Sequence, residues 1–529
     1  MTGENPQESR APEVPEMRVK RWVGLTKNRQ FVRVNGVSPD VNIVPFNHNI
    51  DTLIRAVKER VFLVKENNEF CRPPRPAAGV FSSRLEKSVE MLSAFLPKTA
   101  PLNYQQFVDT YRGRKKGVYQ KALSDLRCSR STIEEDATVE VFIKYEKTDR
   151  TTKVDPVPRV ISPRDAKYNL RVGRYLKRIE EKVFRGLGKL FGHKTVIKGC
   201  DAEMSATLLR QKWDMFKNPI AVGLDASRFD QHVSLDALKV EHSVYQRCFN
   251  KKDGQKLTQI LSHQLVNRCV GRANDGCVEY TVEGTRMSGD MNTSLGNCVL
   301  MVLMIHSYLQ HVGVQGQLAN NGDDCVVFME RNDLDRFMTG LSVWFREMGF
   351  NMVVEIPVTE FEHIEFCQTK PVFDGKTWIM CRNPWTALAK DGVLLKDPSS
   401  DMKHNYFKLW ARAVGVGGVR LSGGLPVLQN FYRFMQSIGH SEYLTSKGRR
   451  KSLKDVDGNE ILPWYMRELG INGKRVFSEP TAEARASFWS AFDVTPDEQV
   501  ELERYYDQLV MDFHVDNRFI PRDVFIDSI

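Results

Sequence analysis

Three segments of the chain carry polar residues at spacings that could do chemistry. The first is Gly322-Asp323-Asp324, which lies between the run Gln317-Leu-Ala-Asn-Asn and the apolar run Cys325-Val-Val-Phe-Met. This pattern predicts a strand, a tight turn and a second strand, with two carboxylates at the tip of a hairpin. Because adjacent carboxylates repel each other, a fold tolerates them best with a cation between them. Taken alone, however, the tripeptide is explained better by a solvated turn.

The second segment is an apolar run that ends in an acid. Ile220-Ala-Val-Gly-Leu leads into Asp225, and Asp230 follows five residues later at the start of a helical pattern. A buried strand that ends in a carboxylate could bring Asp225 to Asp323 and Asp324 around a metal ion. For Asp230 alone, the simpler explanation is a cap at a helix N-terminus.

The third segment is a glycine-flexed loop that runs into an apolar helix, Gly284-Thr-Arg-Met-Ser288-Gly-Asp-Met-Asn-Thr293-Ser-Leu-Gly-Asn297. Thr293 and Asn297 are four residues apart and therefore lie on one face of the helix. A helix with polar caps explains this segment if it stands alone. The chance that all three segments occur in this order in one chain is remote.

The elements that must position these residues follow from the periodicity of the chain. Helical patterns cover 51–65, 82–96, 111–122, 167–187 and 202–215, and 138–147 alternates like a strand. The segment 1–17, rich in Pro, Glu and Ser, is predicted to be disordered. After residue 385 the pattern is mainly helical.

The composition is that of a globular protein with a basic surface. The 529 residues include 76 Lys and Arg against 66 Asp and Glu, a net charge of +10, which favours a polyanionic partner. The ten cysteines are scattered without a CxxC pair, so we expect reduced thiols and no structural zinc. We find neither a signal peptide nor a run long enough to span a membrane, and interpret 298–305 as a buried helix core.

The order acid-x4-acid, SGxxxTxxxN and GDD resembles palm motifs A, B and C of viral RNA-dependent RNA polymerases. The segments GLDASRFDQHVS, GTRMSGDMNTSLGN, NGDDCVV and FCQTKPV are similar to the polymerases of the tombusvirus family of plant viruses, umbraviruses included. YRGRKK near residue 111 and PRVISPRDAKYNLRVGRYLK near residue 158 are also similar to that family. The resemblance covers residues 45–520.

The resemblance implies a mixed α+β fold in the form of a right hand, with a palm built on an antiparallel sheet that carries the GDD hairpin. The boundaries we expect are an N-terminal extension packing on the fingers (1–50), fingers (51–217), palm (218–385, with a fingers insertion around 240–282) and thumb (386–529).

The same resemblance implies roles for individual residues. Asp225, Asp323 and Asp324 would hold two Mg²⁺ or Mn²⁺ ions, which an all-oxygen ligand set favours over zinc. Asp230, Ser288 and Asn297 would form the ribose pocket, supported by Thr293. Hydrogen bonds to a 2′-hydroxyl are what distinguish a ribonucleotide from a deoxyribonucleotide.

Basic residues before the first motif resemble motif F, which contacts the nucleotide triphosphate. Lys144, Lys147 and Arg159 are the residues we expect there, with Lys153 and Arg164 as further candidates. Cys367 and Gln368 lie in a segment that resembles motif E, which grips the primer end. Contacts with RNA phosphates are expected from two basic clusters, comprising Arg112, Arg114, Lys115 and Lys116, and Arg449, Arg450 and Lys451. Surface solvation explains such clusters almost as well.

Three other functions compete with this interpretation. A reverse transcriptase is disfavoured because an acid, rather than a bulky aromatic residue, stands at Asp230. An inactive RNA-binding replication scaffold is disfavoured because all three metal-binding acids are present. A helicase would need a G-x4-GK[ST] loop, which the chain lacks.

The resemblance also implies a working context. It implies copying of a positive-strand RNA genome from an RNA template and nucleoside triphosphates, with de novo initiation. It further implies a place in the host cytoplasm, on the cytosolic face of membranes, through a membrane-anchored viral replication protein or a fused N-terminal part. Whether the chain is a fragment of a readthrough or frameshift product stays open.

Overall fold

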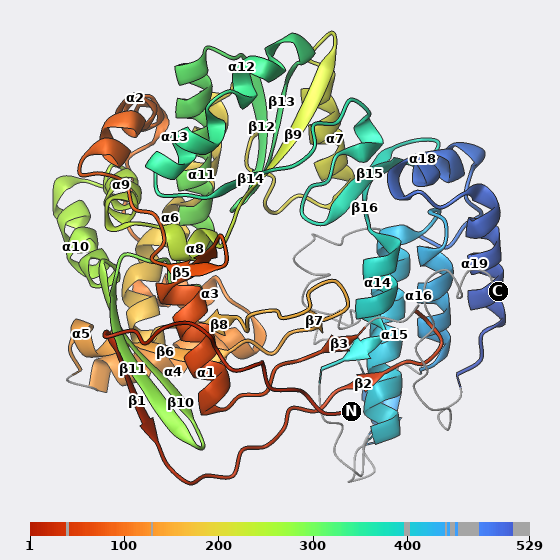
Figure 1. The fold of residues 1–529 in the computed structure, drawn as a ribbon, viewed down its shortest axis with the longest axis horizontal. Helices are drawn as coiled ribbons and strands as arrows, with labels where there is room; N and C mark the ends of the chain where they lie inside the picture. The colour runs from red at the N-terminus through yellow and green to blue at the C-terminus, as the bar shows by residue number, and fades with distance from the viewer. Residues whose placement is uncertain are drawn as a thin grey trace.

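The structure, a computed structural model, describes residues 1–38, 42–128, 131–395, 403–439, 442–444, 450–452 and 475–511. It mixes helices with several antiparallel sheets (Figure 1), so the expected α+β class is confirmed.

A four-stranded antiparallel sheet lies at the centre of the chemistry. Its order is β12-β13-β9-β14, with bounds β12 (Gly316–Asn321), β13 (Asp324–Glu330), β9 (Pro219–Ala226) and β14 (Met352–Val354). In the register of the two middle strands, Leu224 lies opposite Cys325 and Val222 lies opposite Val327. The first and second segments, which carry Asp323, Asp324 and Asp225, therefore meet at the same end of one sheet.

Both faces of this sheet are buried, because successive side chains of a strand point to opposite sides. Val222, Leu224 and Val327 face a core that they share with helix α11 (Thr293–Val312). The alternate side chains face a second core that they share with helix α7 (Ala202–Trp213) and include Ala221, Val326 and Phe328. Figure 1 shows the sheet between these two helices. Packing on both sides holds the strand ends in fixed positions.

Helix α11 is the helix, within the described part of the chain, that is long and apolar enough to cross a membrane by length and composition. However, 83% of its apolar window is buried inside the protein. Residues 298–305 are all buried in the core, as the sequence predicted.

A five-stranded sheet lies beside the central one, in the order β1-β11-β10-β6-β8. Its strands are β1 (Met17–Arg21), β11 (Gly276–Glu283), β10 (Val266–Ala273), β6 (Val139–Ile143) and β8 (Val160–Ile161). In β6, the alternating Val139, Val141 and Ile143 are buried, which confirms the strand expected within 138–147. This sheet joins segments from three distant parts of the sequence.

The predicted helices are found close to their expected bounds. They are α1 (Ile50–Val57), α2 (Val80–Phe95), α4 (Gly113–Cys128), α6 (Ala166–Leu190) and α7. The side chains of Asn49, Asp165 and Asp201 accept backbone N–H groups at the starts of α1, α6 and α7, as N-caps do. Helix α1 is shorter than expected because the chain continues from Lys58 to Phe62 as a π-helical turn.

Shorter elements connect these parts. The helices are α3 (Tyr104–Asp109), α5 (Ile133–Asp136), α8 (Phe229–His232), α9 (Leu235–Gln246), α10 (Lys251–Leu261), α12 (Leu334–Met338) and α13 (Leu341–Glu347). The strands pair as β2 (Val32–Arg33) with β17 (Val393–Leu394), β3 (Ile43–Val44) with β7 (Thr148–Asp149), β4 (Val64–Glu66) with β5 (Glu69–Cys71), and β15 (Thr369–Phe373) with β16 (Trp378–Arg382).

The segment 1–17 differs from the expectation of disorder. Ala11 and Val14 are buried in a core that includes residues of α1, and the backbone N–H of Gly3 donates to the carbonyl of Arg29 at 2.6 Å. The composition of the segment is polar, but its few apolar side chains and its backbone find partners elsewhere in the fold. Composition alone could not reveal those partners.

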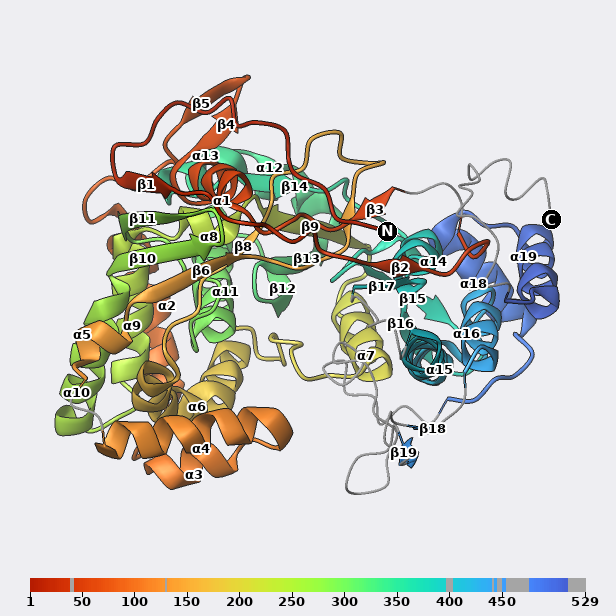
Figure 2. The same ribbon diagram turned by 90° about the horizontal axis from the view of Figure 1, so that it is seen from below.

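The C-terminal part of the described chain is helical, as expected after residue 385. Its helices are α14 (Pro384–Asp391), α15 (Lys403–Ser422), α16 (Leu428–Ser437), α18 (Ala482–Phe492) and α19 (Pro496–Gln508). The N-terminal segment reaches this part as well, because the hydroxyl of Tyr506 donates to the carbonyl of Val37 at 2.7 Å. Residues 1–50 therefore contact both the five-stranded sheet and the C-terminal helices (Figure 2).

Candidate active site

Strand pairing brings the three aspartates to one end of the central sheet. Asn321 and Asp324 pair across the connection between β12 and β13, which consists of Gly322 and Asp323. Gly322 has a φ of +79°, which a glycine adopts without steric cost. Asp225 follows the β9 residue that pairs with the start of β13, so its carboxylate comes from the neighbouring strand.

The three carboxylates act on one another electrostatically. Burial and the nearby charge of Asp230, followed by those of Asp324 and Asp225, raise the pKa of Asp323 to about 6. Burial and the charge of Asp225 raise the pKa of Asp324. The pKa of Asp225 is raised by burial and lowered in part by the cation of Lys153. The ionised carboxylates thus repel each other at this end of the sheet.

This donor set fits a hard divalent cation. Oxygen ligands from carboxylates suit Mg²⁺ or Mn²⁺, and a cation would relieve the repulsion among Asp225, Asp323 and Asp324. Within the described ranges, no three His, Cys, Asp or Glu side chains are already gathered as a metal-ligand group. The electrostatics at this end of the sheet therefore favour a bound cation.

Asp230 and Asn297 meet beside these acids. The side-chain amide of Asn297 donates to the Asp230 carboxylate, with 3.0 Å between Nδ2 and Oδ1. Ser288 comes from the loop before α11, and its hydroxyl donates to the carbonyl of Val160 in β8 at 3.1 Å. Thr293 bonds to its own loop, donating to the Met287 carbonyl at 2.8 Å. The fold thus joins Asp230 to Asn297, while Thr293 supports the loop that carries Ser288.

The basic residues expected at the triphosphate separate into two groups. Lys144 and Arg159 both pair with Glu146, at 3.0 and 3.3 Å. Burial raises the pKa of the Asp230 carboxyl, and Arg159 lies close enough to offset part of that rise. Lys147 differs from the expectation because its ammonium donates to the carbonyl of Lys390 at the end of α14. Burial there lowers the pKa of Lys147 to about 8. Its side chain therefore joins the 144–150 segment to α14.

The two further candidates also differ from each other. Lys153 is exposed and lies near Asp225, as the effect on the pKa of that acid indicates. Arg164 is buried, and its Nε pairs with Asp290 at 2.5 Å. Its Nη1 donates to the carbonyl of Ala137 at 2.6 Å. Arg164 therefore holds the loop before α11 against the start of β6.

A tight turn at Cys367 and Gln368 packs against the GDD connection. Both residues have left-handed φ angles, +53° and +60°, and the flanking Phe366 and Thr369 exchange backbone hydrogen bonds. The side-chain amide of Asn321 donates to the sulfur of Cys367 at 3.3 Å. The charge of nearby Asp324 contributes, after burial, to raising the pKa of the Cys367 thiol to about 12. The fold thus brings Cys367 to the aspartates.

The first basic cluster, which lies at the start of α4, is separate from this site. Figure 2 shows α4 at an edge of the molecule, away from β9 and β13. Arg112, Arg114 and Lys115 are exposed, and Lys116 pairs with Asp109 at 2.9 Å. In the second basic cluster, Arg449 lies outside the described residues. Arg450 and Lys451 belong to strand β19 (Arg450–Ser452), whose side chains also lie outside the described part.

Sequence reasoning missed two residues beneath Asp230. Arg286 and Glu241 form an ion pair whose side chains are completely buried, and Arg286 also bonds to Asn297. Arg286 stands inside the GTRMSG segment, which could have drawn attention to it. Glu241 lies in the middle of α9 and has no sequence signal, because its importance comes only from the partner that the fold supplies.

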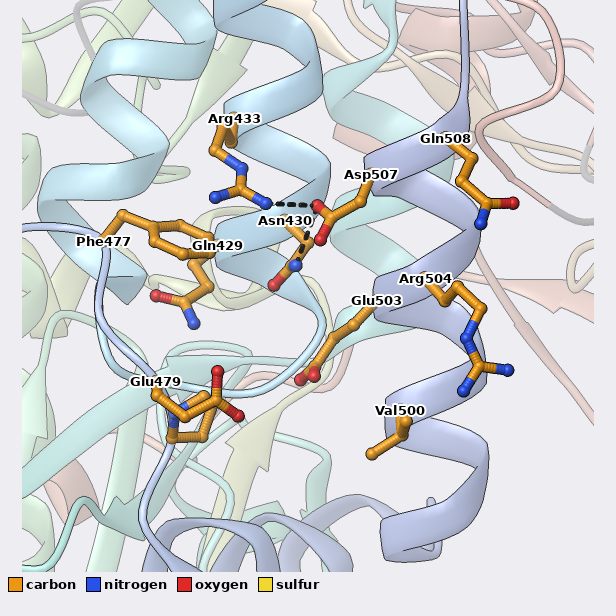
Figure 3. Close-up of a pocket in the computed structure, with 11 residues that line it drawn as sticks. Gln429, Asn430, Arg433, Phe477, Glu479, Val500, Glu503, Arg504, Asp507 and Gln508 are labelled. Carbon is orange, nitrogen blue, oxygen red and sulfur yellow. Dashed lines mark hydrogen bonds and ion pairs between the residues drawn. The ribbon is translucent and has the colours of Figure 1, made fainter.

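A cavity of about 450 Å³ lies elsewhere, between α16 and α19 (Figure 3). Among its lining groups, Arg433 pairs with Asp507 at 2.6 Å, and Glu479 and Glu503 pair with Arg485, which does not line the cavity. None of the residues singled out in the sequence lines it. The candidate site is therefore the group of aspartates rather than this cavity.

A model of one protein family matches almost the whole chain. The family model described as "Viral RNA dependent RNA polymerase" matches residues 17–514. The chain belongs to this family. The expected resemblance to polymerases of the tombusvirus family, umbraviruses included, is thereby confirmed.

The chain is also similar to individual viral polymerases. The chain is 55% identical to the RNA-directed RNA polymerase of Oat chlorotic stunt virus (isolate United Kingdom), over 100% of the chain and 71% of that protein. It is 40% identical to that of Tobacco necrosis virus (strain A), over 91% of the chain and 64% of that protein. For Groundnut rosette virus (strain MC1) the identity is 39%, over 91% of the chain and 54% of that protein. The chain thus spans between about half and three-quarters of these relatives' lengths.

Proposed function

We propose that the chain copies RNA into RNA by nucleotidyl transfer at Asp225, Asp323 and Asp324. The observation that carries this proposal is the junction of the acids with Asp230 and Asn297 at one end of the central sheet. The three aspartates, whose carboxylates favour a divalent cation, lie beside the hydrogen-bonded Asp230–Asn297 pair, which could recognise a sugar. Nucleotidyl transfer needs both, within reach of one nucleotide.

The aspartates would hold two Mg²⁺ or Mn²⁺ ions. When bound, these ions would lower the pKa of the 3′-hydroxyl of the growing RNA. They would also neutralise the charge of the triphosphate and of the departing pyrophosphate. The carboxylates of Asp225 and Asp323 would hold the ions, assisted by Asp324. Their mutual repulsion in the metal-free protein supports this role.

The surrounding side chains would bind and orient the substrates. Asp230, Asn297 and Ser288 would recognise the ribose, with Thr293 as support. Lys144 and Arg159 would offset the charge of the triphosphate. Glu146, which pairs with both, would hold these two cations close together before the nucleotide binds. Lys147 is left out of this group because its ammonium contacts α14.

Two groups of residues would contact RNA. Cys367 and Gln368 would support the primer end, because the turn that they form packs against the GDD connection. The basic cluster at the start of α4, comprising Arg112, Arg114, Lys115 and Lys116, would contact template phosphates at a distance from the chemistry.

The architecture that we propose is a right hand. Fingers would span 51–217 together with the insertion around 240–282, since β6, β8, β10 and β11 form one sheet. The palm would span 218–385, with the GDD hairpin formed by β12 and β13, and the thumb 386–529. The extension 1–50 would pack on the fingers and also reach the thumb through β2.

We further propose a biological setting from the relatives. They are polymerases of plant viruses, so replication of a positive-strand RNA genome in the host cytoplasm is the process in which this chain would act. Initiation would occur de novo. Attachment to the cytosolic face of host membranes would come from a membrane-anchored viral replication protein or a fused N-terminal part.

The decisive test is incorporation of labelled ribonucleotides on a short RNA template with Mg²⁺ or Mn²⁺, with and without a primer. Asp323→Ala should abolish synthesis and leave RNA binding intact, because the change removes one metal ligand and no RNA contact. Synthesis retained by this variant would overturn the site. No synthesis by a folded wild-type chain that still binds RNA would favour the alternative of an inactive RNA-binding scaffold. Incorporation of deoxyribonucleotides in preference would favour a reverse transcriptase.

A further inference from the structure

A completely buried ion pair lies directly beneath the Asp230–Asn297 pair. The guanidinium of Arg286 pairs with the carboxylate of Glu241, and both side chains have no exposed surface. Glu241 also accepts hydrogen bonds from the Asn292 amide at 2.7 Å and from the Tyr245 hydroxyl at 2.8 Å. A buried charge pair is costly to desolvate, so one so fully bonded invites a functional explanation.

Arg286 reaches the sugar-reading residues through two contacts. Its Nε donates to the side-chain oxygen Oδ1 of Asn297 at 3.1 Å. Its backbone N–H donates to the backbone carbonyl of Asp230 at 2.8 Å. Asn297 in turn donates from Nδ2 to the carboxylate of Asp230 at 3.0 Å. The three residues therefore form one chain of hydrogen bonds that starts at a fixed charge.

The chemistry of these groups permits one direction of the Asn297 amide. The Nε–H of an arginine can only donate, and an ionised carboxylate can only accept, whereas an asparagine amide has one accepting and one donating end. With Arg286 at the accepting end, the NH₂ group must face Asp230. One oxygen of Asp230 is then occupied, and the other stays an acceptor for a hydroxyl group.

We propose that Arg286 is a positioning residue that sets sugar selectivity by fixing the direction of the Asn297 amide. This inference rests on the proposed function of Asp230 as the ribose reader. A ribonucleotide offers a 2′-hydroxyl donor to the remaining Asp230 acceptor, and a deoxyribonucleotide leaves that acceptor unpaired. Without the Arg286 contact, the Asn297 amide would be held only by its bond to Asp230, so the direction of the free Asp230 oxygen would be less tightly fixed.

Gly296 supplies an independent observation. A Cβ atom added at this position would overlap the guanidinium nitrogen Nη2 of Arg286 and the carboxylate of Glu241. A glycine inside a helix costs about 1 kcal/mol relative to alanine. Helix α11 keeps it because the ion pair fills the space that a side chain would need. The same residue therefore brings the ion pair against the helix turn that carries Asn297.

The test is Arg286→Lys, measured as the ratio of kcat/KM for a ribonucleotide to kcat/KM for the matching deoxyribonucleotide. A lysine ammonium can keep the charge pair with Glu241, but it lacks the planar fork that also reaches Asn297. We expect this ratio to fall about tenfold, because that is the size of effect expected from losing one hydrogen bond that orients the ribose-binding residues. Tyr245→Phe is the matched control: it removes a bond to the same carboxylate without touching Asn297, so the ratio should not change.

Two further variants keep the inference falsifiable. Gly296→Ala disturbs the ion pair without removing a charge, so it should lower the ratio even if Arg286→Lys does not fold. In an Asn297→Ala background, Arg286→Lys should produce no additional loss, because the two residues act in series.

The outcomes separate this inference from the proposed function. A lowered ratio in Arg286→Lys or Gly296→Ala, with Tyr245→Phe unchanged, supports the inference. An unchanged ratio in every folded variant overturns it, and if Asp230→Ala still lowers the ratio, the proposed function survives. Equal lowering by Tyr245→Phe also overturns it, because the effect would then be general to the buried cluster. A wild-type chain without polymerase activity would refute the proposed function itself.

Discussion

Replacing Asp323 by asparagine should stabilise the metal-free protein while it destroys activity. In the fold, the pKa of this carboxyl rises from 3.8 to about 6, chiefly through burial and the neighbouring carboxylate of Asp230. At about 1.4 kcal/mol per tenfold change in proton affinity, the ionised form costs the folded state up to about 3 kcal/mol. Asp323 is partly exposed, and solvent screening reduces this to about 1–2 kcal/mol. An asparagine removes that cost.

The pH dependence has a definite sign. Because the folded state binds the Asp323 proton more tightly than the unfolded chain, the favourable contribution is present below about pH 4 and is lost as the pH rises through about 6. The stability gap between Asp323→Asn and the wild type should therefore be largest above pH 7. At pH 5 it should narrow to about half.

Thermal melting in EDTA at pH 7.5 and pH 5 measures this gap. For a chain of this size we expect the variant to melt about 1–3 °C higher at pH 7.5. Mg²⁺ should raise the melting temperature of the wild type more than that of the variant, since only the wild type keeps all three carboxylates. Asp125→Asn, on the exposed face of α4, is the control and should melt like the wild type. A variant no more stable than the wild type in EDTA would refute the electrostatic argument, as would a gap that is independent of pH.

Two other changes test the surroundings of the site. Lys147→Met should leave the KM for nucleotides within about twofold of the wild-type value, because the ammonium contacts the Lys390 carbonyl. Arg159→Met should raise this KM more. Equal effects of the two changes in steady-state kinetics would contradict the separate roles assigned to Lys147 and Arg159. Gly223→Ala should destabilise the protein by no more than about 1 kcal/mol, because the added Cβ would meet the carboxylate of Glu355, the exposed end of a flexible side chain that can move away. Adding Glu355→Ala should recover most of the loss in a denaturation experiment, and a double variant as unstable as the single one would show that the overlap is not the cause.

Local patterns determined most of the helices and the order of the chemical segments. Helix α6 was predicted over 167–187 and runs from Ala166 to Leu190, because an amphipathic repeat and an N-cap are both local features. The place of Asp225 after an apolar run likewise followed from the sequence, since a buried strand ends there in the fold. The disorder expected for 1–17 failed, because its partners, such as Arg29 and α1, are distant in the sequence.

Only the tertiary structure decided which of the candidate residues meet. Thr293 and Asn297 share a helix face in the sequence pattern, yet Asn297 bonds to Asp230 while Thr293 bonds to its own loop. Lys144 and Lys147 belong to one basic segment, but they point to Glu146 and to α14. These differences depend on strand register and on contacts with helices that are distant in the sequence.

The buried Arg286–Glu241 pair is the clearest example of a contact that the sequence does not predict. Its two residues are 45 positions apart, and the carboxylate lies in a helix without any local signal. The sequence by itself determined the chemical types and the local spacing of the site, because these depend on neighbours along the chain. Which side chains touch, and therefore which way the Asn297 amide points, was decided by long-range packing, because a hydrogen bond needs its partner brought within about 3 Å in three dimensions.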